Sequence, residues 1–230
     1  MKTIGLIGGM TWHSTADYYR LLNEDVHRRL GGSHSAAIAM TSVDFDEIEK
    51  LQLSGDWDRL AGIMTDAALK TEAAGADLML ICANTMHQTA DRVSAALGIP
   101  LLHIADAAAA EIRRRGFKKV GLLGTCYTME MDFYKTRLEK KHGLSVLVPD
   151  KSQRRDVNEI IFRELAYGRI LTESRAVYQE IIADLQKRGA EGVILGCTEI
   201  PLLIKPADSP IPVFDTTALH CKAAVDAALA

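Results

Sequence analysis

Short apolar runs alternate along this chain with longer segments in which apolar residues recur at every third or fourth position. Residues 4–7 form the first run, and the two glycines that close it are typical of the end of a buried parallel strand. Residues 14–30 follow with the period of a helix and a capping sequence at its start. The alternation predicts further strands at 38–40, 78–81, 100–104, 118–124, 193–196 and 211–214, and helices at 57–75, 85–97 and 105–115.

The second half of the chain repeats the first. Three segments return in the same order and at nearly constant separation: 2–8 as 118–124, 75–85 as 189–199, and 99–102 as 211–214. A general likeness among Val/Ile/Leu-rich strands weakens each match singly, but it weakens the ordered set less. We therefore expect an α/β protein of two similar Rossmann-like lobes with parallel sheets, related by pseudo-two-fold symmetry, each of about 110 residues.

The ends of the predicted strands carry the polar residues of interest. In open parallel sheets, ligands bind beyond the carboxyl ends of the strands, at the point where the strand order reverses. Residues 8–11, 83–85 and 197–199 all follow such strands. The duplicated pattern therefore predicts an active site between the two lobes.

Composition and charge narrow the class of partner. The chain has 230 residues, of which 48% are hydrophobic and 25% charged, as in an ordinary globular enzyme. A formal net charge of −3 gives no electrostatic reason to expect nucleic acid or an anionic membrane. No apolar stretch approaches the roughly 18 residues of a membrane span, and the first strand is too short for a signal peptide. We expect a cytoplasmic protein that acts on a small molecule.

The cysteines are spaced for neither metal binding nor disulfide pairing. Without a secretion signal, we expect reduced thiols and no metal site. The four are Cys82, Cys126, Cys197 and Cys221.

Cys197 is the principal catalytic candidate. It ends the apolar run 193–196 and precedes a predicted helix, whose free N–H groups and dipole favour negative charge. We expect its pKa to lie below the free-thiol value of about 8.5. A buried structural cysteine is the alternative interpretation. The position of Cys197 at the end of a strand, at a switch point where the strand order reverses, favours a catalytic role.

Asn84, Thr85 and Thr198 stand at two predicted helix starts. Their short polar side chains are favoured as helix N-caps, and two capped helix starts that face one cleft would also hold a carboxylate. The loop 8–11 lacks the G-x-G-x-x-G spacing of a dinucleotide site. Its glycines more simply allow a tight turn or the close approach of a small ligand.

Two motifs carry a family resemblance. Residues 82–87 read Cys-Ala-Asn-Thr-Met-His and residues 196–200 read Gly-Cys-Thr-Glu-Ile. With 6–10, 42–45 and 122–125, they make the chain resemble the aspartate/glutamate racemase family over nearly its full length. It looks most similar to the bacterial branch described as L-aspartate/glutamate-specific or broad-specificity amino-acid racemases.

The resemblance implies an organisation and a mechanism. It implies a homodimer without a cofactor, with a first lobe of residues 1–100 plus 213–230 and a second of residues 101–212. One cysteine removes the α-proton of an amino acid from one face, and a second thiol delivers a proton to the other face. By position, Cys197 is one acid/base, Asn84, Thr85 and Thr198 bind the α-carboxylate, Met10 lines the site through its backbone, and Gln52 approaches the far end of the substrate.

The chain departs from the family pattern at Ala83, which stands where the first thiol is usual. Related enzymes of the same branch carry threonine there, but alanine cannot exchange a proton. Cys82 is one residue earlier, and successive side chains of a strand point to opposite faces. Cys82 can serve as the second acid/base only if the strand has ended or bulged before it.

The stretch 156–168 departs as well. It resembles the region in which aspartate-specific members place a cation for the side-chain carboxylate of the substrate. Glu164 stands there, beside Arg163, and would repel an acidic side chain. A substrate other than aspartate or glutamate therefore becomes more credible.

Three functions are compatible with these residues. The first is cofactor-independent racemisation of aspartate, glutamate or a wider range of amino acids, made asymmetric by Ala83. A single-cysteine decarboxylase or isomerase of the same superfamily, similar to arylmalonate decarboxylases, is the second. The third is a non-catalytic amino-acid-binding protein, which the missing thiol favours and the retained Cys197 opposes.

Overall fold

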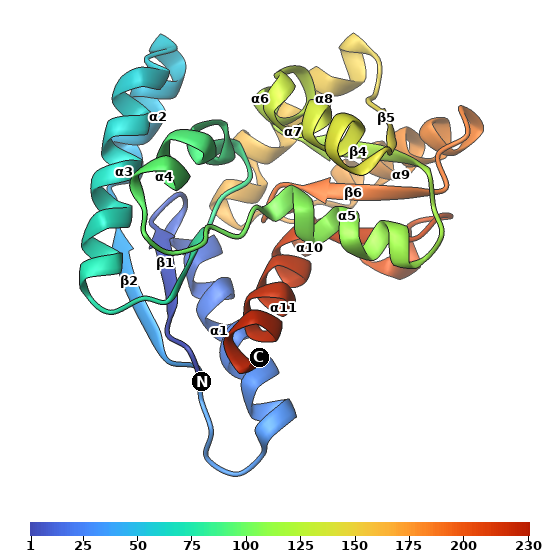
Figure 1. Ribbon diagram of the computed structural model, residues 1–230. Helices are drawn as coiled ribbons and strands as arrows, with labels where there is room; N and C mark the ends of the chain where they lie inside the picture. The colour runs from blue at the N-terminus through green and yellow to red at the C-terminus, as the bar shows by residue number, and fades with distance from the viewer. The chain divides into compact units, whose positions relative to one another are not determined.

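The apolar runs of the sequence form parallel strands, joined by helices that cross over the sheets (Figure 1). The computed structural model describes residues 1–230 and contains one three-stranded and one four-stranded sheet. The chain divides into two units, residues 1–104 with 220–230, and residues 105–219. The predicted α/β class with two parallel sheets is confirmed.

The first unit is built on three parallel strands in the order β2-β1-β3. Ile4 of β1 lies opposite Ile38 of β2 and Leu78 of β3, so β1 is the central strand. The elements are β1 (Ile4–Gly8), α1 (Trp12–Leu30), β2 (Ile38–Ser42), α2 (Phe45–Ser54), α3 (Trp57–Ala73), β3 (Leu78–Ile81), the 3₁₀ helix η1 (Thr85–Thr89), α4 (Ala90–Ala96) and most of α11 (Thr216–Leu229).

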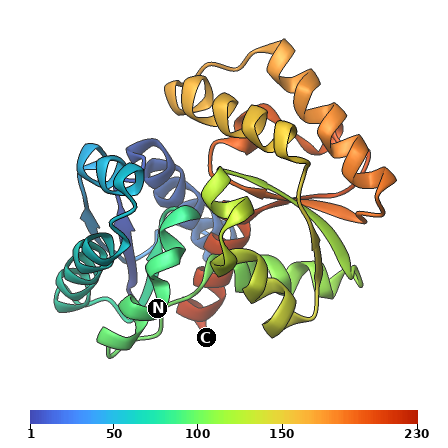
Figure 2. The same ribbon diagram turned by 90° about the horizontal axis from the view of Figure 1, so that it is seen from above.

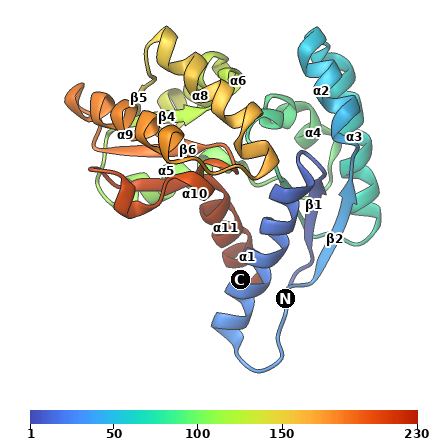
Figure 3. The ribbon, with the colours of Figure 1, turned by 180° about the vertical axis from the view of Figure 1, so that it is seen from behind.

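Alternate residues of β3 enter different hydrophobic cores. Leu78 and Leu80 pack with buried side chains of α1 and α11, whereas Met79 and Ile81 pack with those of α2, α3 and α4. Figure 3 shows α1 lying along the sheet formed by β1 and β2. The sheet is therefore covered on both faces, which explains why β1 and β3 are buried along their whole length.

The second unit repeats this plan with four parallel strands in the order β5-β4-β6-β7. In Figure 2, α8 and α9 lie on one face of the sheet, and α5 and α7 lie on the other. The elements are α5 (Ile104–Arg114), β4 (Lys119–Gly124), α6 (Cys126–Glu130), α7 (Asp132–Thr136), the π-helix η2 (Arg137–Lys141), β5 (Ser145–Leu147), α8 (Lys151–Arg163), the 3₁₀ helix η3 (Leu165–Tyr167), α9 (Thr172–Lys187), β6 (Gly192–Gly196), α10 (Ile200–Leu203), the 3₁₀ helix η4 (Pro206–Asp208) and β7 (Val213–Asp215).

The structure differs from the sequence expectation in three places. Residues 213–219 lie in the second unit instead of the first, because Val213 of β7 pairs with Val193 of β6. Residues 101–104 lie in the first unit, and Leu101 forms only an isolated bridge to Met79. The single helix expected at 85–97 is divided into η1 and α4. No helix combines the length and the hydropathy needed to cross a membrane.

In each sheet, the first strand of the unit lies between the next two strands of the chain, so the direction in which strands are added reverses at β1 and at β4. The chain leaves β1 for β2 on one side and reaches β3 on the other, and it leaves β4 for β5 and β6 in the same way. Ligands bind at such a reversal, beyond the carboxyl ends of the strands. The segments at these ends are 9–11 and 82–85 in the first unit, and 125–126 and 197–199 in the second.

Gly9 allows the first of these loops to turn tightly. Its φ is +97°, and a Cβ atom built there would lie 2.1 Å from the carbonyl oxygen of Val43. Its N–H donates to Thr15 Oγ1 at 2.8 Å, which ties the loop to the first turn of α1. A side chain at this position would therefore need both a rare backbone conformation and a shift of β2's continuation.

We expect Gly9→Ala to lower the free energy of unfolding by about 2–4 kcal/mol, because the methyl group has no space and φ is positive. Gly55→Ala is the matched control, since Gly55 has φ +72° but open space around its Cβ direction. Gly55→Ala should lower the free energy of unfolding by only about 1 kcal/mol. Urea unfolding followed by circular dichroism measures both, and equal losses would contradict the steric argument.

Candidate active site

In the second unit, the residues after β6 form a compact hydrogen-bonded group. The thiol of Cys197 lies 2.9 Å from Glu199 Oε2, and the hydroxyl of Thr198 lies 2.6 Å from the same oxygen. Both groups donate to the carboxylate. A thiol, a hydroxyl and a carboxylate within hydrogen-bond reach are the components of an acid/base site.

Cys197 is buried, with 8% of its surface exposed, and belongs to the hydrophobic core of its unit. Burial raises the pKa of its thiol well above the usual range, and the charge of Glu199 raises it further. The expectation of a lowered pKa is therefore wrong. The N–H groups of Glu199 and Thr198 do oppose the rise, but α10 is a single turn and its dipole is small.

Glu164 lies at the end of α8 and accepts a short hydrogen bond from the hydroxyl of Ser174 in α9. Between these helices, Tyr178 donates to the carbonyl oxygen of Val157 at 3.3 Å. Burial raises the pKa of Tyr178, and the neighbouring Cys197 and Glu164 raise it further. Glu164 and Cys197 therefore both lie within electrostatic range of one tyrosine, in the same unit.

In the first unit, Cys82 and Ala83 lie on opposite sides of the sheet. Cys82 is fully buried in the core beneath α1 and α11, and this burial raises the pKa of its thiol far above the usual range. Ala83 belongs to the other core, together with Met10. The strand alternation thus continues past the last residue of β3, and no bulge turns Cys82 to the side of Ala83.

Two of the residues expected to line the substrate, Met10 and Gln52, lie on the side of Ala83. Met10 and Met86 pack in the same core as Ala83, and the amide of Gln52 lies 3.1 Å from the sulfur of Met86. Asn84 is buried, with 4% of its surface exposed, and its side chain does not cap η1. Asn84 therefore occupies the N-cap position of η1 without a capping hydrogen bond from its side chain. Thr85 follows it, half-buried, in η1.

His87 holds the loop of Ala83 in place. Its Nδ1 lies 2.8 Å from the carbonyl oxygen of Ala83, and its Nε2 accepts from the N–H of Ile104 at 3.2 Å. The ring is therefore neutral, with its proton on Nδ1. The rings of His103 and His220 lie 4.5 Å and 5.7 Å from that of His87.

The sequence interpretation missed this histidine cluster because none of its members occupies a repeated position. His220 is more than a hundred residues from the other two, so only the packing of α11 against the first unit brings it near them. A signal for His87 was available, since it follows Ala83 by one helical turn, where a side chain reaches back to a carbonyl. In the described residues, no group of three or more His, Cys, Asp or Glu could hold a metal ion.

Comparison with known proteins identifies the family. The model of the Asp/Glu/Hydantoin racemase family matches residues 7–224. The chain is also 29% identical to the broad-specificity amino-acid racemase RacX of Bacillus subtilis (strain 168), over 175 residues that make up 76% of this chain and 75% of RacX.

Two solved structures agree with the fold over their whole length. A candidate Asp/Glu racemase from Yersinia pestis is 52% identical, with a TM-score of 0.95 and 100% of both chains covered. An aspartate racemase homologue from Pyrococcus horikoshii OT3 is 38% identical, with a TM-score of 0.86 and again 100% of both chains covered. This chain belongs to the Asp/Glu/hydantoin racemase family, and it is an isomerase of the amino-acid racemase type. The family resemblance of its motifs is thereby confirmed.

We expect Glu199→Gln to lower the pKa of Cys197, because the charge that disfavours the thiolate is removed. The pH at which the thiolate absorbance of Cys197 appears, taken as the difference from a Cys197→Ser variant, should move to lower pH. Glu173→Gln is the control, since Glu173 is exposed at the start of α9 and should leave the titration unchanged. An unchanged titration in Glu199→Gln would contradict the assigned cause.

Proposed function

We propose that this protein is a cofactor-independent amino-acid racemase in which Cys197 is the one catalytic thiol. The observation that carries the proposal is the hydrogen bond of 2.9 Å from Cys197 Sγ to Glu199 Oε2 at the switch point of the second unit. The contrast with the first unit supports it, because a methyl group stands at Ala83 and the thiol of Cys82 lies in the opposite core.

Proton transfer begins with the thiol of Cys197. Its proton passes to the carboxylate of Glu199, which already accepts a hydrogen bond from it, and a thiolate forms. The thiolate then removes the α-proton of the amino acid, and the electron pair of the C–H bond delocalises into the α-carboxylate. Return of a proton to the opposite face inverts the centre, and return from Cys197 restores the starting enantiomer.

The α-carboxylate would be bound by Asn84, Thr85 and Thr198, with the backbone of Met10 beside it. A carboxylate held by such donors accepts the developing negative charge, which is the main electrostatic requirement of carbanion chemistry. Gln52 would approach the far end of the substrate. Because Ala83 cannot donate a proton, water or another group must serve the second face, and the reaction becomes slow or favours one enantiomer.

The substrate is best sought among amino acids without an acidic side chain. Glu164 is held by Ser174 and, like Cys197, lies within electrostatic range of Tyr178; its charge would repel a carboxylate on the substrate's side chain. The description of RacX as a broad-specificity enzyme is compatible with this choice. The homodimer, the cytoplasmic location and the placement of the site between the lobes stay predictions.

Ala83 also favours a second candidate, a single-cysteine decarboxylase. Such an enzyme needs a thiol on only one face, which protonates the carbanion after carbon dioxide leaves. A protein that binds an amino acid without acting on it is the third alternative, which the thiol–carboxylate pair at Cys197 makes less favourable.

Incubation of the protein with separate L- and D-amino acids in heavy water distinguishes these functions. We expect α-deuteration that depends strongly on the enantiomer supplied. Cys197→Ala should lower the exchange rate by about 10²–10⁴-fold, the usual contribution of a general base. Cys82→Ala is the matched control and should retain most of the activity.

Three results would contradict the proposal. Equal losses in the two cysteine variants would show that Cys82 also reaches the substrate. Carbon dioxide release from malonates without amino-acid exchange would identify the decarboxylase instead. Amino-acid binding with neither reaction would identify a binding protein.

Ala83→Cys should raise the rate of inversion by roughly tenfold or more, because it supplies a proton donor on the second face. Measured by polarimetry from both enantiomers, the rates should become more nearly equal. Ala83→Ser, which is similar in size but a poorer acid, controls for the added volume. Faster inversion in neither variant, with folding intact, would show that residue 83 does not face the substrate.

A further inference from the structure

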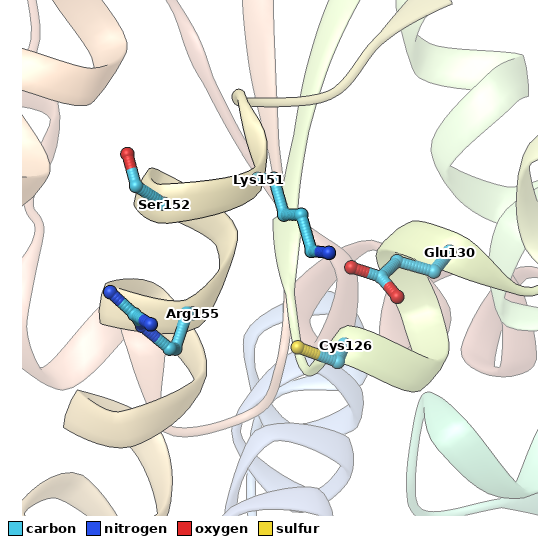
Figure 4. Close-up of a pocket in the computed structure, with 5 residues that line it drawn as sticks. All are labelled: Cys126, Glu130, Lys151, Ser152 and Arg155. Atoms are coloured by element: carbon cyan, nitrogen blue, oxygen red, sulfur yellow. The ribbon is translucent and has the colours of Figure 1, made fainter.

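A cavity of about 440 Å³ opens in the second unit, beside the carboxyl end of β4. Cys126 and Glu130 of α6 line one side, and Lys151, Ser152 and Arg155 from the first turns of α8 line the other (Figure 4). None of these residues takes part in the proposed proton transfer. The volume lies within the usual range of small-molecule sites.

The cations around this cavity outnumber the carboxylates. Glu130 accepts from Arg154 Nε at 2.8 Å, so its charge is already matched. The ammonium group of Lys151 points toward the carboxylate of Glu130 in Figure 4, but neither Lys151 nor Arg155 forms an ion pair. Lys151 and Arg155 thus line the cavity as cations without an ion pair, while the one carboxylate of its lining is already matched by Arg154.

Asp150 caps the start of α8. Asp150 accepts from Gln153 N at 2.9 Å and from Ser152 Oγ at 2.8 Å. Even when the charge of Asp150 is counted, the side chains around the cavity keep a net positive charge. Lys151 and Arg155 are therefore the cations available for recognition in this cavity.

Cys126 places a thiol on the wall of the cavity. Its N–H donates to Asn158 Oδ1 at 2.8 Å, which fixes its backbone against α8. It is half-buried, whereas Cys82, Cys197 and Cys221 are buried. A reagent from solution should therefore reach Cys126 first. Burial and the charge of Glu130 raise the pKa of its thiol, and Arg154 lowers it, so the reactivity of Cys126 responds to the charges around the cavity.

We propose that this cavity binds a small oxyanion, a carboxylate or a phosphate group, between Lys151 and Arg155. The guanidinium of Arg155 supplies a planar pair of donors that matches such a group, and Lys151 supplies a mobile point charge. The site lies at the end of β4, which neighbours β6 and Cys197 in the sheet. Its occupancy does not depend on the racemase proposal.

Alkylation of Cys126 tests the charge of the cavity. Iodoacetate is an anion and iodoacetamide is neutral, so the ratio of their rates cancels differences in access. Peptide mass spectrometry separates Cys126 from the other cysteines. In the folded protein we expect the ratio of the iodoacetate rate to the iodoacetamide rate to exceed that of the urea-unfolded chain by about fivefold, as two nearby exposed cations would produce. The double variant Lys151→Gln/Arg155→Gln should return it to the unfolded value.

Arg113→Gln/Lys140→Gln is the matched control, because it removes the same two charges from exposed positions of the same unit. It should leave the ratio unchanged. If the control lowers the ratio as much as the cavity variant, or if the folded and unfolded ratios agree, the effect is not local and the proposal is overturned.

Protection experiments identify the oxyanion. At constant ionic strength set with chloride, phosphate and succinate are tested separately for slowing the reaction of Cys126 with iodoacetamide. Protection by phosphate alone supports a phosphate-bearing ligand, and protection by succinate alone supports a carboxylate. Protection by both supports a general oxyanion site, and in each case Lys151→Gln/Arg155→Gln should abolish it. Protection by neither overturns the proposal.

Discussion

The alternation of side chains along β3 is the constraint on which the chemistry of this protein depends. Successive residues of a strand point to opposite faces, and both faces of this sheet are covered by helices. Leu78, Leu80 and Cys82 therefore enter one core, while Met79, Ile81 and Ala83 enter the other. One step in this period decides that a methyl group, and not a thiol, stands beside Met10.

The second unit carries, at the end of β6, the thiol that the first unit lacks at Ala83. Its β6 ends in Cys197, whose thiol donates to Glu199 in a largely apolar surrounding. Burial and the nearby carboxylate raise the pKa of this thiol well above its usual range, and the N–H groups at the start of the single-turn α10 only partly oppose that rise. The carboxylate has two effects, because it disfavours the thiolate by its charge and yet offers the nearest acceptor for the thiol's proton.

Other polar groups of the protein are arranged around these strand ends. Gly9 permits the tight loop after β1, and His87 holds the carbonyl of Ala83 from the other side. In the second unit, the cavity between α6 and α8 presents Lys151 and Arg155 at the end of β4. The two units thus share one plan, while the side chains at equivalent strand ends differ in charge and acidity.

Much of the fold could be predicted because hydrophobic period and glycine position are local properties. The strands at 4–7, 78–81 and 193–196, and the departure at Ala83, follow from the amino-acid order alone. The pairing of β7 with β6 in the second sheet could not be predicted in this way, because strand pairing depends on contacts between residues that are distant in sequence.

The site residues divide along the same line. The sequence alone singled out Cys197 as a catalytic candidate and Ala83 as a departure from the family pattern, because motifs and repeats are formed by neighbouring residues. Only the tertiary structure decided the direction of the Cys197 pKa shift, the core that receives Cys82, and the histidine cluster that includes His220. The physical reason is that burial and electrostatic environment are summed over everything that surrounds a group, and those surroundings exist only after the chain has folded.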